Sequence, residues 1–286
     1  MNETGLKELT EAVADTLVRA GSVFPPDRYG AYARAMEDDT ELSVWAMKQI
    51  VDNAKVAEKN RSPLCDDTGI PHLLLQIGKN RSINGDMLEA IYEGVRSGLK
   101  KLPGRPMAVK GDDKQRIEQS EGLMEDPAGL VPAPLSMEYV DDEERLRLYI
   151  LMQGGGPEIR AKTYRVFHRH SLDTVLEEII QWARESVSQL GCSPCTLAVG
   201  IGRSHFEASA MMLRAMTEGR YDVQNECEKR ITAAVNESNT GALGLGGKNS
   251  VLATFMKTGP QRASGVRIVC MRPCCCFEPR VAMLDL

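Results

Sequence analysis

The chain alternates between stretches of helical periodicity and short breaks over its first 134 residues. Apolar residues recur every three or four positions within 6–17, 40–59 and 86–99, which is the period of an amphipathic helix. The segment 72–77, with three consecutive leucines, predicts a buried strand. Residues 103–134 are rich in proline, glycine and charge, so we expect a loop there.

The second half mixes strand and helix patterns. The segments 136–140 and 145–152 predict two strands of a hairpin turned by four acidic residues, and 196–201 predicts another strand. Further helices are predicted over 172–190, 206–218 and 222–237. Because helices and hairpins are mixed without a regular β–α–β alternation, the pattern predicts a mixed α+β fold.

Composition narrows the class of protein. The 286 residues carry a formal net charge of −5, and 42% of them are hydrophobic, as in an ordinary globular protein. A mildly acidic chain is a poor non-specific ligand for nucleic acid. We see no apolar run of the roughly 18 residues that a membrane span needs, and no signal-peptide pattern at the N-terminus. We therefore expect a cytoplasmic protein without nucleic-acid or membrane partners.

The cysteines are the main chemical signal, and they are too sparse for a disulfide scaffold. The eight are Cys65, Cys192, Cys195, Cys227, Cys270, Cys274, Cys275 and Cys276. Cys192 and Cys195 form a C-x-x-C pair, but a zinc site needs a second pair at suitable spacing, and the tail cysteines are adjacent. Two further interpretations stay open on spacing alone. The cysteines are unrelated core residues, or Cys65, Cys192 and the tail converge on a four-iron cluster that keeps one iron open as a Lewis acid.

The glycine-rich loop 241–248 does not fit a phosphate-binding P-loop. Ala242 stands where that motif needs its first glycine, and Asn249 stands where it needs Ser or Thr. The glycines instead suit close backbone packing or positive φ angles.

Several segments, in the right order along nearly the whole chain, resemble one family. Pro63-Leu64-Cys65-Asp66-Asp67-Thr68-Gly69 is similar to the Pro-Leu-Cys-Gln-Asp-Thr-Gly signature of the α subunit, or N-terminal domain, of class I iron–sulfur fumarases and L-tartrate dehydratases. Further similar segments begin at Gly104 (Gly-Arg-Pro-Met, including Pro106), Gln153 (Gln-Gly-Gly-Gly-Pro-Glu), Cys192 (Cys-Ser-Pro) and Gly241 (Gly-Ala-Leu-Gly-Leu-Gly-Gly-Lys). Cys276, Arg280 and Ala282 reproduce the family's Cys-x-x-x-Arg-x-Ala spacing, although counting from Pro260 favours Cys274.

The resemblance implies one α+β domain of the fumarase N-terminal type over 1–286, with helices packed on mixed, partly antiparallel sheets. It implies a hydro-lyase acting on a small hydroxy-dicarboxylate of the malate/fumarate or tartrate type. A four-iron four-sulfur cluster (4Fe-4S) would be held by Cys65, Cys192 and Cys276, with Cys274 as the alternative third ligand. A β subunit would supply the general base and further carboxylate-binding residues, in a homo- or hetero-oligomer.

The resemblance also assigns roles around the cluster. Asp67 would be catalytic and orient the substrate hydroxyl. Asp66, Arg105, Gly154, Gly155 and Gly156 would bind substrate, with Arg105 clamping a carboxylate through two parallel hydrogen bonds and the glycines letting backbone amides approach its oxygens.

The chain departs from the family pattern at polar positions. Asp66 replaces a glutamine, Gln153 a lysine and Ile159 an asparagine, and Gln261 or Arg262 stands in place of a histidine. Because these changes alter charge near the expected site, the alternative function is a diverged, non-catalytic or regulatory binding subunit of the same fold.

Overall fold

The computed structural model describes residues 2–102, 104–105 and 107–286, so Pro106 of the predicted arginine-bearing segment lies outside the described residues. The chain forms two compact units that interleave along the sequence. Unit 1 comprises residues 1–23, 54–154 and 280–286, and unit 2 comprises residues 24–53 and 155–279. The two are described separately below.

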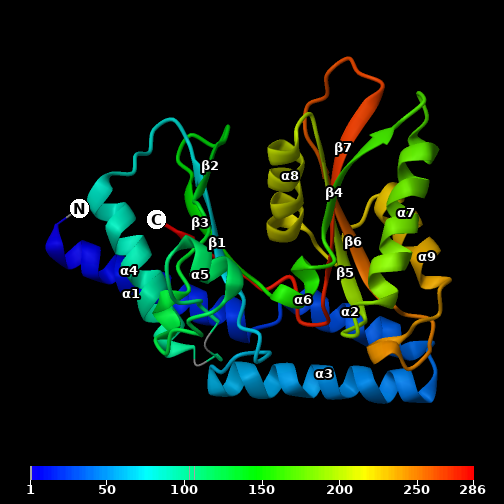
Figure 1. Cartoon of the computed structure of the whole chain (residues 1–286), viewed down its shortest axis with the longest axis horizontal. Helices are drawn as coiled ribbons and strands as arrows, with labels where there is room; N and C mark the ends of the chain where they lie inside the picture. Colours follow the sequence, from blue (N-terminus) through cyan, green and yellow to red (C-terminus); the bar gives the residue numbers. More distant parts are fainter. Residues whose placement is uncertain (1, 103, 106) are drawn as a thin grey trace. The chain divides into compact units, whose positions relative to one another are not determined.

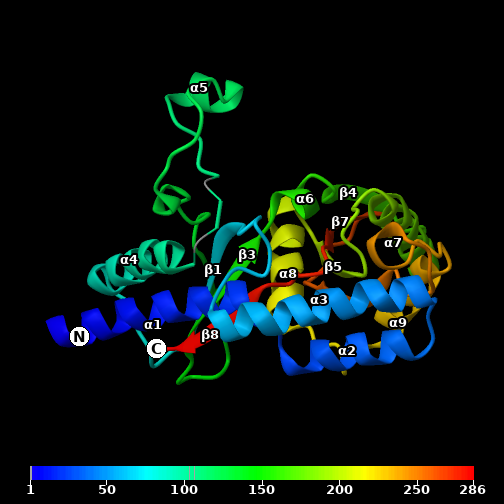
Figure 2. The ribbon, with the colours of Figure 1, turned by 90° about the horizontal axis from the view of Figure 1, so that it is seen from below.

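Unit 1 is a four-stranded sheet covered by helices. The strand order is β2 (Ser136–Tyr139), β1 (Ile70–Ile77), β3 (Leu146–Gln153) and β8 (Val281–Asp285). Helices α1 (Glu3–Ser22) and α4 (Gly85–Lys101) lie side by side and share a core with β1 and β3 (Figure 2). The long loop after α4 carries α5 (Asp113–Glu118) and the short 3₁₀ helix η1 (Pro127–Gly129).

The predicted hairpin of 136–140 and 145–152 is wrong. Both strands exist, but β1 lies between them, pairing with β2 in parallel and with β3 in antiparallel orientation. The physical reason is burial. β1 and β3 are the apolar strands that line the core, whereas β2 alternates between exposed and half-buried positions and takes the edge.

Unit 2 is a sheet with helices on both faces. Its order is β4 (Lys162–Phe167), β7 (Val266–Cys274), β5 (Cys195–Gly202) and β6 (Val251–Thr258). In Figure 1, α8 (His205–Glu218) covers one face, and α7 (Leu172–Ser188) and α9 (Glu226–Asn236) cover the other. The unit also contains α2 (Pro26–Glu37), the first part of α3 (Glu41–Asn60), α6 (Gly155–Glu158) and the 3₁₀ helix η2 (Ala242–Gly244).

Periodicity missed several elements: α2, α5 within the predicted loop 103–134, α6, and the strands β4, β6, β7 and β8. Helix α2 is the longest of the missed helices. Pro25-Pro26 looks like a break, yet Pro26 is the first residue of the helix. Proline suits that position because its missing N–H would be unpaired there and its fixed φ is already helical. The mixed α+β class is confirmed, whereas a single domain over 1–286 stays a prediction. No helix in the described part of the chain is long and apolar enough to cross a membrane.

Candidate functional site

The predicted cluster cysteine of unit 1 lies in a turn between α3 and β1. Leu64 anchors this turn, because its side chain is buried and its N–H donates to Gly21 O at 2.9 Å. Cys65 is half-buried, and its thiol donates to Asp66 Oδ1 over 3.4 Å. The same oxygen accepts the Asp67 N–H at 3.0 Å. The carboxylate of Asp66 therefore organises the turn around Cys65.

Asp66 also contacts the predicted carboxylate clamp. Arg105 Nη1 lies 3.5 Å from Asp66 Oδ2, and both side chains are exposed. The thiol hydrogen bond of Cys65, and after it the charge of Arg105, hold the pKa of Asp66 below its usual value. The guanidinium that the resemblance assigns to a substrate carboxylate is thus paired with a carboxylate of the chain itself.

Asp67 and Gly154 are brought together within unit 1 by Arg280. The Asp67 carbonyl accepts from Arg280 Nη1 at 2.6 Å, and Arg280 Nε donates to Met152 O at 3.1 Å. A Cβ placed on Gly154 would lie 2.7 Å from Asp67 Oδ2, so glycine is what lets the carboxylate approach the backbone. In the sequence Arg280 marks only the spacing after Cys276; in the structure it is buried, and its hydrogen bond to the Asp67 carbonyl holds the backbone of this candidate residue.

Thr68 adds a further polar group next to Asp67. Its side chain is buried, and its Oγ1 has no hydrogen-bond partner among the described residues. A buried hydroxyl without a partner is uncommon, because leaving its hydrogen bond unmade costs free energy.

Unit 2 brings Cys192 and Cys276 together. The Cys276 N–H donates to Cys192 O at 2.8 Å. A hydrogen bond with the Cys192 side chain, then one with Cys275 and then burial, raise the pKa of the Cys276 thiol well above its usual value. Cys192 is exposed and Cys276 is buried, so the pair reaches from the surface of unit 2 into its interior.

The turn of residues 275–279 is held by a buried cation from α2. Arg28 is fully buried, and its guanidinium donates to the carbonyl oxygens of residues 275–279 at 2.6–3.5 Å. Tyr32 Oη adds a hydrogen bond to Cys276 O at 2.8 Å. The guanidinium also lies 4.2 Å from the centre of the Phe24 ring. The missed helix α2 thus supplies the support of the Cys276 turn.

A buried ion pair ties the same turn to β7. Arg272 Nη2 lies 3.1 Å from Glu278 Oε2, and both side chains are fully buried. Arg272 also contacts Glu158 of α6. Burial alone would lower the pKa of Arg272, but the negative charges around it, that of Glu278 foremost, raise the pKa overall.

The remaining tail and motif cysteines have different surroundings. Cys274 ends β7, pairs with Thr196 in the sheet register and is fully buried, and this burial raises the pKa of its thiol well above the usual value. Cys195 belongs to the apolar core of unit 2, whereas Cys192 is exposed, so the two cysteines of the C-x-x-C pair differ in burial. Among the described residues no cysteine forms a disulfide, and no group of three or more His, Cys, Asp or Glu is gathered closely enough to hold a metal ion.

The two glycine-rich segments, residues 154–156 and 241–248, have different surroundings. Gly155 and Gly156 open the short helix α6 and are exposed, and a Cβ on Gly156 would meet nothing within 4 Å. At the end of the 241–248 loop, the N–H groups of Lys248 and of the following residue, Asn249, donate to Asp39 at 2.8 and 3.1 Å. These two amides therefore already bind a carboxylate of the chain.

Comparison with known proteins decides the family. Residues 10–283 match the family described as "Fumarate hydratase (Fumerase)". The chain belongs to this family. Fumarate hydratases are hydro-lyases, so the predicted enzyme class is confirmed at the level of the family, as is the resemblance itself.

Two curated relatives align with most of this chain. One is a Methanocaldococcus jannaschii protein named "Putative L(+)-tartrate dehydratase subunit alpha", 26% identical over 87% of this chain and 88% of its own length. The other is a Geobacillus stearothermophilus protein named "Putative fumarate hydratase class I", 24% identical over 86% of this chain and 49% of its own length.

Proposed function

We propose that this chain is the α component of an iron–sulfur hydro-lyase that reversibly dehydrates a small hydroxy-dicarboxylate of the malate/fumarate or tartrate type. The observation that carries the proposal is the juxtaposition of Cys192 and Cys276 in a chain of the fumarate hydratase family. We propose these two thiolates and that of Cys65 as the ligands of a 4Fe-4S cluster.

The chemistry of these side chains supports such a group. Thiolates are the protein ligands that iron–sulfur clusters use. Cys276 contacts Cys192, whereas Cys274 is fully buried in the sheet, which supports Cys276 as the third ligand. When bound, a cluster with three protein thiolates would supply an open iron that acts as a Lewis acid toward the substrate.

The chain's own residues would bind and orient the substrate. Asp67 would accept a hydrogen bond from the substrate hydroxyl, and Arg280 fixes the backbone from which Asp67 projects. Arg105 would donate two hydrogen bonds to a substrate carboxylate, which requires it to leave Asp66. We propose Asp66 and the backbone amides of residues 154–156 as further substrate contacts, as the resemblance implies.

A β subunit completes the proposal. The Methanocaldococcus relative is named a subunit alpha and is matched over 88% of its length, which supports a separate partner chain. We propose that the partner supplies the general base for the proton next to the carboxylate, together with further carboxylate-binding residues. We further propose a cytoplasmic homo- or hetero-oligomer that binds neither nucleic acid nor membranes.

A second candidate, a non-catalytic binding subunit, has one specific observation in its favour. Asp66 neutralises the arginine that would bind a substrate carboxylate. In a binding subunit this pair would be permanent, whereas in an enzyme the substrate must displace it.

The test is anaerobic reconstitution with iron and sulfide, followed by the visible spectrum and the iron content per chain. We expect a brown protein with about four irons. Serine substitutions of Cys65, Cys192 and Cys276 should each abolish the colour, whereas Cys274→Ser and Cys227→Ser serve as matched controls and should keep it. A colourless, folded wild-type protein would refute the cluster.

Activity then separates the two candidates. The reconstituted chain is mixed with its co-expressed partner and assayed for hydration of fumarate and dehydration of malate and tartrate. Turnover that disappears in Asp67→Asn, with the spectrum unchanged, supports the enzyme. A loaded complex that binds these acids without turnover supports the binding subunit.

A further inference from the structure

Unit 2 contains a cavity of about 260 Å³ that the proposed hydro-lyase site does not use. It opens beside the N-terminal end of α7 and is lined by Ile201 near the end of β5 and by Met256 of β6. Ile201 lies six residues along β5 from Cys195, or about 20 Å at the usual strand rise. The cavity therefore lies far along β5 from the Cys192–Cys276 pair.

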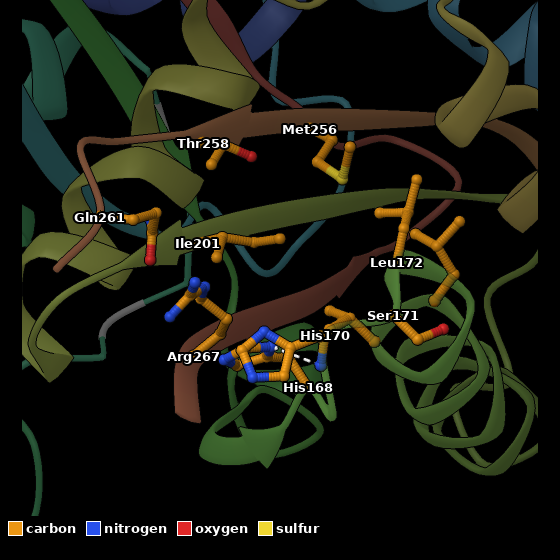
Figure 3. A pocket seen from close by; sticks show the side chains of 11 residues that line it. His168, His170, Ser171, Leu172, Ile201, Met256, Thr258, Gln261 and Arg267 are labelled. Carbon is orange, nitrogen blue, oxygen red and sulfur yellow. Dashed lines mark hydrogen bonds between the residues drawn. The ribbon is translucent and has the colours of Figure 1, made fainter. Parts of the chain in front are cut away.

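The lining is basic at one end and apolar elsewhere. Arg267, His168 and His170 lie close together in Figure 3, and Leu172 and Met256 lie across from them. Among the described residues, no aspartate or glutamate lines the cavity. Positive charge beside apolar walls, with no carboxylate to balance it, suits an anion that carries an apolar body.

The basic end is built around a buried histidine. His168 Nε2 lies 2.7 Å from Ser264 O, and its Nδ1 accepts the His170 N–H at 2.9 Å, which assigns the proton of the neutral ring to Nε2. His170 itself has a φ of +56°, a conformation that non-glycine residues seldom adopt. Its ring lies edge-on against that of His168, with centroids 5.0 Å apart. His168 thus holds both the backbone and the ring of His170 at the cavity.

Arg267 keeps donors available for a ligand. Its Nη1 donates to Ser264 O at 3.3 Å and to Val266 O at 3.0 Å. Within the described residues, Nε and Nη2 have no such partner. Two adjacent guanidinium N–H groups match the two oxygens of a carboxylate.

We propose that this cavity binds a small monocarboxylate with a short apolar chain. The carboxylate pairs with Arg267 beside His170, and the chain lies against Leu172, Ile201 and Met256. The volume is slightly below the usual range for drug-sized ligands, which fits a molecule the size of hexanoate. This site is independent of the proposed hydro-lyase activity.

The test is calorimetric titration of the whole chain with hexanoate, hexanol, hexylammonium and acetate. Hexanol lacks the charge, hexylammonium reverses it, and acetate lacks the apolar body. We expect saturable binding of hexanoate at least about tenfold tighter than that of the other three. Cys65→Ser should bind hexanoate equally well, so failure of the cluster proposal leaves this result unaffected.

Variants locate the site. Arg267→Gln should weaken hexanoate binding about tenfold or more. His170→Asn should weaken it less, and asparagine tolerates the positive φ. Arg165→Gln is the matched control, since this arginine lies on β4 over Phe167, outside the lining, and binding should not change. The proposal is overturned if hexanoate does not saturate, if hexanol binds as tightly, or if Arg267→Gln binds hexanoate normally with an unchanged thermal unfolding temperature.

Discussion

The turns that carry Cys65 and Cys276 differ in how the residues next to each cysteine are held. Around Cys276 the support is buried, because Arg28 of α2 donates to the carbonyls of residues 275–279 and Arg272 pairs with Glu278. Around Cys65, Leu64 and Arg280 are buried, but the contacts next to the thiol are exposed, because Asp66 is bonded to the thiol and paired with Arg105. The comparison shows that two cysteines of one proposed ligand set differ in their surroundings: Cys276 lies in a turn held by buried contacts, whereas the contacts beside Cys65 are exposed and can rearrange.

Burial explains why we expect the two turns to contribute differently to the free energy of unfolding. A buried guanidinium is costly to desolvate, and the structure compensates with hydrogen bonds that cannot be exchanged for water. An exposed ion pair gains little, because water and salt screen it. We therefore expect substitutions at the Cys276 turn to cost stability and those at Asp66 to change binding rather than folding.

The largest effect should follow removal of the cation beneath the Cys276 turn. Arg28→Met leaves several buried carbonyls without a donor, and we expect a loss of about 5 kcal/mol in the free energy of unfolding. Arg34→Met on the same helix is the control, since Arg34 is exposed and makes one hydrogen bond, to Tyr221 O. Chemical denaturation measures both. Equal losses would show that the buried support does not matter.

The next largest loss of stability should follow removal of the buried ion pair between Arg272 of β7 and Glu278. Arg272→Met leaves Glu278 buried without its main cation, and we expect a loss of about 3 kcal/mol. Arg272→Met combined with Glu278→Gln should cost less than the sum of the two single changes, because the unpaired charge is gone. A double-mutant cycle of unfolding free energies tests this, and strict additivity would contradict the coupling.

A smaller effect is expected in unit 1, where glycine allows Asp67 to approach the backbone. Gly154→Ala places a Cβ 2.7 Å from Asp67 Oδ2, and we expect a cost of about 1–3 kcal/mol together with a displaced carboxylate. Gly85→Ala, at the first residue of α4 in the same unit, is the matched control, because its Cβ meets nothing within 4 Å. Thermal unfolding and turnover of the reconstituted complex should change for Gly154→Ala alone.

The smallest effect is expected at Asp66. In the chain before reconstitution, where Cys65 keeps its thiol proton, the Asp66 carboxyl should have a pKa below the ordinary 3.8, as followed by carboxyl-carbon NMR. Cys65→Ala should raise this pKa, and Arg105→Gln should raise it less, because the thiol bond is the larger cause. A lowered folded-state pKa gives stability that is present above the unfolded-state value and is lost as the pH falls through the folded-state value. Since Asp66 is exposed, Asp66→Asn should leave the unfolding temperature at pH 7 unchanged.

Local patterns predicted much of the fold. The helices at α1, α3, α4, α7, α8 and α9 and the strands at β1, β3 and β5 follow from spacing within a few residues. Helix α2 was missed because Pro25-Pro26 signals a break as well as a helix start. The neighbours of β1 could not be predicted, because strand order depends on which apolar strands the whole unit buries.

For the site, the sequence by itself determined the family, the candidate cysteines and the segment around Asp67, because these motifs are short and keep their spacing. Only the tertiary structure decided that Cys276 contacts Cys192, and that Asp66 pairs with Arg105. It also decided that Arg28 and Arg280 hold the two turns. The physical reason is that these contacts join residues far apart in the chain, and their energies depend on burial that no local spacing encodes.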